Sequence, residues 1–128
     1  MTYIDSSVAL AQLFVEDRRP PKSLWDEVLT ASRLLSYEVW TRVHARRLDR
    51  IHEEKVRTIL DAIAFVELTP IVLVRALEPF PRPVRTLDAL HLATMEFLRG
   101  QGQPIELASY DARLVGAARA LGIPIRAL

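Results

Sequence analysis

The feature that most constrains the fold is an alternation of short apolar runs with longer segments in which apolar residues recur every three or four positions. The short runs are typical of strands, and the longer spacing places apolar side chains on one face of a helix. Strands are expected over residues 2–4, 30–33, 66–69, 105–109 and 123–125, and helices from residue 5 onward and over 22–29, 34–47, 53–66, 69–78, 86–99 and 111–121. Residues 71–74 (IVLV) fit a buried strand as well as a helix, because periodicity does not separate the two. Strands that alternate with helices predict a three-layer α/β/α fold with a central, mostly parallel sheet of four or five strands.

The composition fits one globular domain over residues 1–128 and narrows the chemistry. Half of the residues are hydrophobic and 26% are charged, which is an ordinary globular balance. The chain has no cysteine, so disulfides, thiolate catalysis and cysteine zinc sites are excluded. The net charge of +1 argues against a general polyanion binder. No apolar run is long enough for a membrane span and no secretory signal is recognised, so a cytoplasmic location is expected.

Four carboxylates occupy positions that a parallel sheet would bring together. Asp5 follows the first expected strand and Asp111 follows the strand 105–109, whereas Glu38 and Asp88 lie early in two helices. Strand C-termini and helix N-termini share one rim of a parallel sheet, and ligands bind where the strand order switches. Converged carboxylates repel one another and lose hydration, so they are tolerated where a cation joins them. Oxygen ligands of this kind select Mg²⁺ or Mn²⁺, and such a site supports phosphodiester hydrolysis.

Each of these acids also has a purely structural explanation. Asp5 and Asp111 fit helix N-caps, worth about 1 kcal/mol each, and Asp88 can oppose its helix dipole for ~0.3–1 kcal/mol. Glu38 can pair with Arg42 one turn further on, for ~0.3–0.5 kcal/mol. The structural explanation fits Asp88 least well, because its neighbours in the segment LDALHLA are almost all apolar and burying an unpaired carboxylate is costly.

Four sequence segments resemble the motifs of one nuclease family. They are YIDSSVAL at residues 3–10, SYEVWTR at 36–42, TLDALHLAT at 86–94, and ASYD at 108–111 with the helix that follows it to residue 123. In this order and spacing they are similar to the four acidic motifs of PIN domains, especially the VapC toxin ribonucleases of VapBC toxin–antitoxin pairs. The third segment is the most specific match, and together the four extend over nearly the whole chain.

The resemblance implies a PIN-like fold and a Mg²⁺- or Mn²⁺-dependent endoribonuclease. Its metal ligands and catalytic acids would be Asp5, Glu38, Asp88 and Asp111. Ser6 and Ser109 would place hydroxyl groups beside the acids, although many relatives have threonine where this chain has Ser109. The resemblance also implies an RNA substrate, a homodimer and a cognate VapB-like antitoxin whose C-terminal tail blocks the site.

Arginines near these acids are candidates for RNA contact, because a guanidinium group binds phosphate through two parallel hydrogen bonds. Arg42, Arg46 and Arg50 recur at four-residue steps and are expected on one helical face. Arg82 and Arg85 lie in the proline-rich loop before the third acidic motif. The alternative is a solvated face in which these arginines pair with nearby glutamates.

Other function classes fit the sequence less well. The main alternative is a catalytically silent PIN-fold scaffold that binds RNA or protein, although such a protein is expected to lose acids. A phospho-acceptor receiver domain would need a lysine after its last strand, and the only lysines are Lys22 and Lys55. A nucleotide-binding Rossmann unit would need a glycine-rich loop after its first strand, and this chain has none there. The three histidines lie on separate expected helices and form no metal-binding motif, and the sequence does not distinguish an RNA from a DNA substrate.

Overall fold

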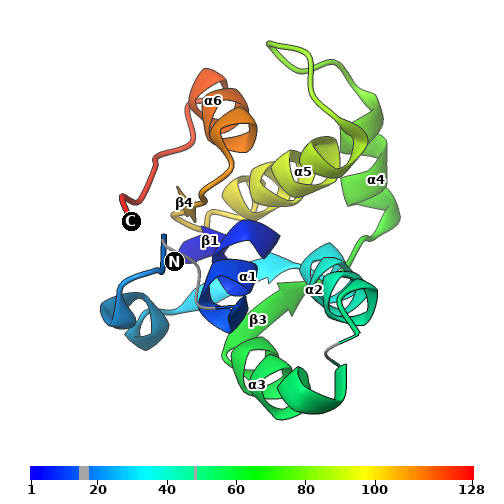
Figure 1. Cartoon of the computed structure of the whole chain (residues 1–128). Helices are drawn as coiled ribbons and strands as arrows, with labels where there is room; N and C mark the ends of the chain where they lie inside the picture. The colour runs from blue at the N-terminus through cyan, green and yellow to red at the C-terminus, as the bar shows by residue number, and fades with distance from the viewer. Residues whose placement is uncertain (15–17, 48) are drawn as a thin grey trace.

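The sheet at the centre of the protein is built from parallel strands. The computed structural model describes residues 1–14, 18–47 and 49–128. The strands are β1 (Thr2–Ile4), β2 (Leu29–Ser32), β3 (Ile63–Val66) and β4 (Glu106–Ala108), in the order β3-β2-β1-β4 (Figure 1). Each of the three neighbouring pairs is parallel. The predicted parallel sheet is confirmed, with four strands in the part of the chain that the structure describes.

Helices cover both faces of this sheet, which gives the expected three layers. They are α1 (Ser6–Phe14), the 3-10 helix η1 (Lys22–Asp26), α2 (Leu34–Ala45), α3 (Asp49–Asp61), α4 (Pro70–Leu77), α5 (Thr86–Gly100) and α6 (Ala112–Ala120). Successive residues of β1 point to opposite faces. Ile4 packs with residues of α1, α2 and α3, whereas Tyr3 packs with residues of α5 and α6, and both side chains are fully buried. α4 packs against the outside of α5 (Figure 1).

The strand order defines where a ligand is expected to bind. From β1 the sheet grows through β2 and β3 on one side and through β4 on the other. In parallel sheets the crevice beyond the carboxyl ends of the strands at such a switch is the usual ligand site. Asp5 directly follows β1 and Ser109 directly follows β4, so both residues lie at this crevice.

One expected helix contains a strand in the structure. The apolar spacing predicts a helix over residues 53–66, but α3 ends at Asp61 and Ile63–Val66 forms β3. All four residues of β3 pair with β2, and this long-range pairing overrides the local helical pattern because strand preference depends on the neighbouring strand. The strand expected at 66–69 is therefore wrong.

Three smaller differences concern short segments. Residues 22–29 were expected to form one helix, but they form only η1, and β2 begins one residue earlier than predicted. Residues 71–74 lie inside α4, so the helical alternative for that segment is confirmed. The strand expected at 123–125 is reduced to an isolated bridge with β4. No described helix has both the length and the apolar character that crossing a bilayer requires.

Candidate active site

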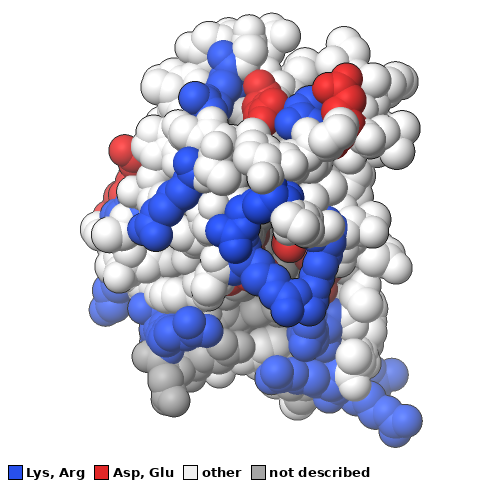
Figure 2. Space-filling model, turned by 90° about the horizontal axis from the view of Figure 1, so that it is seen from above, with Lys and Arg blue, Asp and Glu red and all other residues white. Residues whose placement is uncertain are grey.

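A hollow opens on the face of the molecule that Figure 2 shows. Basic side chains border the hollow, and acidic atoms are visible at its bottom (Figure 2). A floor of acids with a basic border is an arrangement that draws in a polyanion while keeping negative charge at the centre.

Asp5 occupies the junction between β1 and α1. Its side chain is only 4% exposed, and the Ser7 hydroxyl donates a 2.6 Å hydrogen bond to its Oδ1 atom. Burial raises the pKa of Asp5 to about 6, and the hydrogen bond from Ser7 opposes this rise only in part. A charged carboxylate is therefore disfavoured at this position unless positive charge lies beside it.

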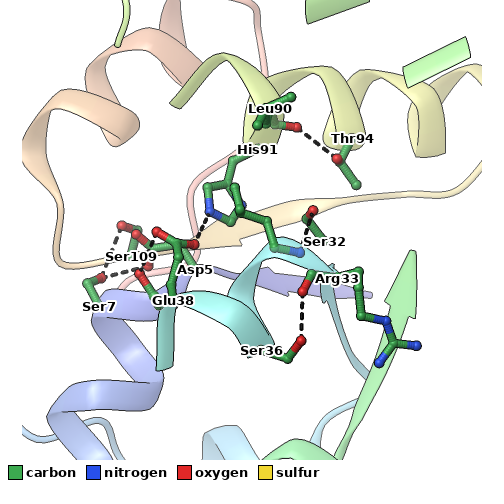
Figure 3. Close-up of polar contacts among 12 residues, drawn as sticks. Asp5, Ser7, Ser32, Arg33, Ser36, Glu38, Leu90, His91, Thr94 and Ser109 are labelled. Atoms are coloured by element: carbon green, nitrogen blue, oxygen red, sulfur yellow. Dashed lines mark hydrogen bonds and ion pairs between the residues drawn. The ribbon is translucent and has the colours of Figure 1, made fainter. Parts of the chain in front are cut away.

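Two serines join the end of β1 to the end of β4 (Figure 3). Ser7 Oγ accepts a 2.9 Å hydrogen bond from the N–H of Tyr110 and lies 3.4 Å from Ser109 Oγ. Ser109 Oγ accepts a 2.9 Å hydrogen bond from the N–H of Asp111. These contacts hold Asp5 next to the loop that carries Asp111. Ser109 is a sequence candidate, whereas Ser7 was not singled out.

Hydrogen bonds reach both carboxylate oxygens of Glu38 in α2. His91 Nε2 lies 2.8 Å from Glu38 Oε1, and the Ser6 hydroxyl donates to Oε2 at 3.3 Å. His91 comes from α5 and is 3% exposed, so this contact crosses from one helical layer to the other (Figure 3). The partner of Glu38 is thus His91, and the alternative pairing with Arg42 is not formed.

A buried chain of hydrogen bonds continues from His91 to β2. The Tyr3 hydroxyl lies 2.6 Å from His91 Nδ1, and the N–H of Ser32 donates to the Tyr3 oxygen at 3.1 Å. His91 thus uses both of its ring nitrogens, Nδ1 toward Tyr3 and Nε2 toward Glu38. Burial keeps the pKa of the Tyr3 hydroxyl far above its ordinary value, so the hydroxyl remains a donor. The sheet thereby sets the orientation of a carboxylate on α2.

Asp88 lies in the first turn of α5 and is half-buried. Burial raises its pKa, and the negative charge of Asp111 raises it further, against a hydrogen bond from the backbone of Arg85. Asp111 also raises the pKa of Asp5. Asp111 therefore lies close enough to both Asp5 and Asp88 to disfavour the charged form of each.

Asp111 caps the N-terminus of α6. Its Oδ1 atom accepts hydrogen bonds from the N–H groups of Arg113 at 2.9 Å and Leu114 at 3.3 Å. The structural explanation as a helix cap is therefore confirmed for this residue. The cap uses Oδ1 and fixes the carboxylate at the crevice.

The four carboxylates share one rim, but they do not form a preformed metal-ligand cluster. Within residues 1–14, 18–47 and 49–128, no three Asp, Glu or His side chains are close enough to hold a metal ion. The donor chemistry nevertheless fits a hard divalent cation, because all four groups are carboxylates. A cation would also offset the burial and repulsion that raise the pKa values of Asp5 and Asp88. The residues thus fit Mg²⁺ or Mn²⁺ in charge and chemistry, and their side chains would have to move to bring their oxygens onto one ion.

The arginines predicted to contact RNA line two pockets beside these acids. A pocket of about 320 Å³ is lined by Arg82, Arg85 and Arg113 together with Asp88. A second pocket of about 180 Å³ is lined by Ser7, Arg18, Arg42 and Arg46, among others. The first pocket adjoins the acidic rim through Asp88. The second adjoins it through Ser7, which binds Asp5 directly.

The single helical face expected for Arg42, Arg46 and Arg50 is not formed. α2 ends at Ala45, and Arg50 lies in α3. Between them the backbone turns at Arg47, which has a φ of 54°. A residue in this left-handed region is a common way to end a helix.

His91 and Arg113, like Ser7, belong to the site and were not among the sequence candidates. His91 follows Asp88 by three positions, and residues at that spacing share a helix face. This spacing was the available signal, since His91 otherwise stands in an apolar segment. Arg113 follows Asp111 by two positions, at the start of α6, and no pattern in the sequence connects it with Arg82.

Comparison with known proteins gives a family and a set of similar structures. Residues 2–121 match the family model described as "PIN domain". A search of curated proteins finds no match. Among solved structures, a toxin–antitoxin complex from Klebsiella pneumoniae is similar, with a TM-score of 0.69, 17% identity and 94% coverage of each chain.

Two further structures have the same fold. VapC20 of Mycobacterium tuberculosis, described as a sarcin–ricin loop cleaving toxin, gives a TM-score of 0.65 at 20% identity, over 91% of this chain and 95% of that one. A Pyrobaculum aerophilum protein gives 0.63 at 19% identity, over 98% of this chain and 89% of that one. At such identities the similarity shows a shared fold.

Proposed function

Because this chain belongs to the PIN domain family, whose model matches residues 2–121, we propose that it is a Mg²⁺- or Mn²⁺-dependent endoribonuclease. The observation that carries the proposal is the set of four carboxylates at one rim, of which Asp5 is buried and has a pKa raised to about 6. Folding such charges together is unfavourable for the protein alone, and a bound cation accounts for it. Asp5, Glu38, Asp88 and Asp111 would be the metal ligands and catalytic acids.

When bound, the cation would stabilise the negative charge that develops on the phosphodiester during hydrolysis. The protein's own groups set the geometry around it. Ser7 holds the buried Asp5 carboxylate, and Ser109 Oγ accepts a hydrogen bond from the N–H of Asp111, which keeps the loop that carries Asp111 in place. Ser6 and His91 hold both oxygens of Glu38. Such supporting hydrogen bonds orient ligating carboxylates in metal sites.

The proposal extends to the partners of the protein. RNA is the proposed substrate, because arginines line both pockets beside the acids and one similar structure is described as a toxin that cleaves the sarcin–ricin loop. Another similar structure is a toxin–antitoxin complex, which supports a VapC-like toxin that is inhibited by a cognate VapB-like antitoxin. A homodimer acting in the cytoplasm, with residues 1–128 as one PIN domain, completes the proposal.

A second candidate function is a PIN-fold scaffold that binds RNA or protein without turnover. The absence of a three-ligand cluster among the described residues favours this alternative. The complete set of four acids favours the nuclease.

The test is incubation of purified protein with total bacterial RNA in Mg²⁺ or Mn²⁺, beside an EDTA control. The Asp5→Asn and Asp88→Asn variants remove one charge each while keeping side-chain shape, and Arg57→Gln serves as a control because Arg57 pairs with Glu53 away from the acids. Discrete fragments from wild type and Arg57→Gln, absent from both Asn variants and from EDTA, are expected. Equal cleavage by wild type and both Asn variants would sink the proposal.

A further inference from the structure

Three arginines and one acid enclose a pocket at the base of the proline-rich loop. Arg82 and Arg85 come from this loop, Arg113 from the first turn of α6, and Asp88 from the first turn of α5. We propose that this pocket of about 320 Å³ binds a phosphodiester group of the RNA backbone next to the bond that is cut. The inference rests on the proposed nuclease function and specifies how its substrate is held.

The pocket carries an excess of positive charge, which favours an anionic ligand. Among the described residues, Arg33, Arg57, Arg75 and Arg126 each form an ion pair with a glutamate. In the same part of the chain no carboxylate forms an ion pair with Arg82, Arg85 or Arg113, and all three side chains are exposed. Among the described residues that line the pocket, Asp88 supplies the only carboxylate. Three guanidinium groups against one carboxylate leave positive charge that a phosphodiester can neutralise through paired hydrogen bonds.

Gly116 in α6 makes room for the Arg82 guanidinium. A Cβ atom built at Gly116 would lie only 2.7 Å from Arg82 Nη1, so the end of the Arg82 side chain would have to shift away from α6 to admit it. Glycine is a poor residue for a helix interior, so its presence in the middle of α6 agrees with a need for this close approach. The guanidinium therefore lies against the surface of α6, on the same side as Arg113 and Asp88.

The position of Asp88 favours RNA over an acidic protein segment as the ligand. Asp88 is at once a wall of the pocket and one of the acids proposed to act in cleavage. A phosphate bound by the three arginines would lie beside that acid, so the next phosphodiester along the strand would reach the acidic rim. An acidic peptide has no phosphodiester to present to the acidic rim, so the position of Asp88 beside the pocket does not favour it as the ligand.

The test compares Gly116→Ala with Gly100→Ala. Both replace a helical glycine by alanine, but a Cβ atom at Gly100 meets nothing within 4 Å. Both variants are therefore expected to melt at or above the temperature of the parent protein, since alanine favours helix. Each is made in the Asp5→Asn protein, and binding of a short fluorescein-labelled single-stranded RNA of mixed sequence is measured by anisotropy over a range of salt concentrations.

We expect Gly116→Ala to weaken RNA binding on the order of 5- to 10-fold and to reduce the salt dependence by about 0.7 in log–log slope, the amount for one lost phosphate contact to a single strand. Gly100→Ala should match the parent. Arg82→Ala should reproduce the loss, and adding Gly116→Ala to Arg82→Ala should cause no further change, because the glycine acts through that guanidinium.

The inference would be overturned if Gly116→Ala bound RNA as well as Gly100→Ala does. It would also be overturned if Gly116→Ala weakened RNA binding by the same factor when Arg82 is already alanine. A third contrary result would be that Gly116→Ala loses binding to an oligoglutamate peptide but not to RNA. Wild type that cleaves RNA while the Gly116→Ala protein binds normally would refute the pocket and keep the nuclease. A wild type that cleaves no RNA, combined with the expected binding losses, would refute the nuclease and keep the pocket.

Discussion

Replacement of Tyr3 by phenylalanine removes a single buried hydroxyl and keeps the ring. That hydroxyl accepts from the N–H of Ser32 at 3.1 Å and is bonded to His91 Nδ1 at 2.6 Å, and the Tyr3 side chain has no exposed surface. The variant therefore opens no large cavity, but it leaves a buried N–H and a buried ring nitrogen without partners. Each buried group left in this way costs about 1–3 kcal/mol, so the two together should lower the free energy of unfolding of Tyr3→Phe by about 2–6 kcal/mol.

This loss is a large fraction of the ~5–15 kcal/mol that a domain of this kind has in total. It is measured by equilibrium urea denaturation of metal-free protein, with Tyr110→Phe as the matched control. Tyr110 is partly exposed, and its ring contacts Arg18, so its hydroxyl should be worth less than ~0.5 kcal/mol. A Tyr3→Phe protein as stable as Tyr110→Phe would refute the hydrogen-bond chain from Ser32 to Glu38.

Three further predictions concern the acids. The pKa of Asp5 is raised from 3.8 to about 6 in the folded state, so the folded protein binds this proton more tightly than the unfolded chain does. Stability from this group is fully present below pH 4 and is lost as pH rises through 6, a fall of roughly 3 kcal/mol. Urea titrations in EDTA should show this fall for wild type and not for Asp5→Asn; a flat wild-type profile would contradict it. Asp111→Ala removes both hydrogen bonds at the start of α6 and should cost about 1 kcal/mol, whereas Asp111→Asn, which keeps an acceptor, should cost less; equal losses in the same denaturation assay would argue against the cap. Mg²⁺ should raise the melting temperature at pH 7.5, with a rise that grows with metal concentration, and Asp88→Asn should reduce it; an equal rise in that variant would remove Asp88 from the metal site.

Local patterns predicted those parts of the fold that neighbouring residues determine. The helix expected over residues 69–78 is formed as α4, and the helix expected from residue 111 is formed as α6, where Asp111 is the cap. β3 could not be found in this way, because Ile63 and Val66 continue the helical spacing of α3 and become a strand only by pairing with β2. That pairing joins segments more than thirty residues apart, which no local window includes.

The same division applies to the candidate site. Asp5 and Asp111 were recognisable because each follows a strand at the carboxyl edge of a parallel sheet. His91 was not, because its two partners, Tyr3 and Glu38, are 88 and 53 positions away. The contact between Gly116 and Arg82 likewise depends on how α6 packs beside the proline-rich loop. The proposed catalytic acids and their supporting groups differ in this respect, since Asp5, Asp88 and Asp111 lie at element ends whereas their partners are brought in by tertiary packing.

The most direct test of the central claim is a Mn²⁺ titration of the protein followed by the electron paramagnetic resonance signal of the free ion. The claim is that the rim carboxylates act together as one divalent-cation site. Wild type should bind Mn²⁺ at this site, Asp5→Asn and Asp88→Asn should each weaken binding about tenfold or more, and Mg²⁺ should compete. Binding of Mn²⁺ that is the same in wild type and in both Asn variants, or no binding at all, would contradict the account.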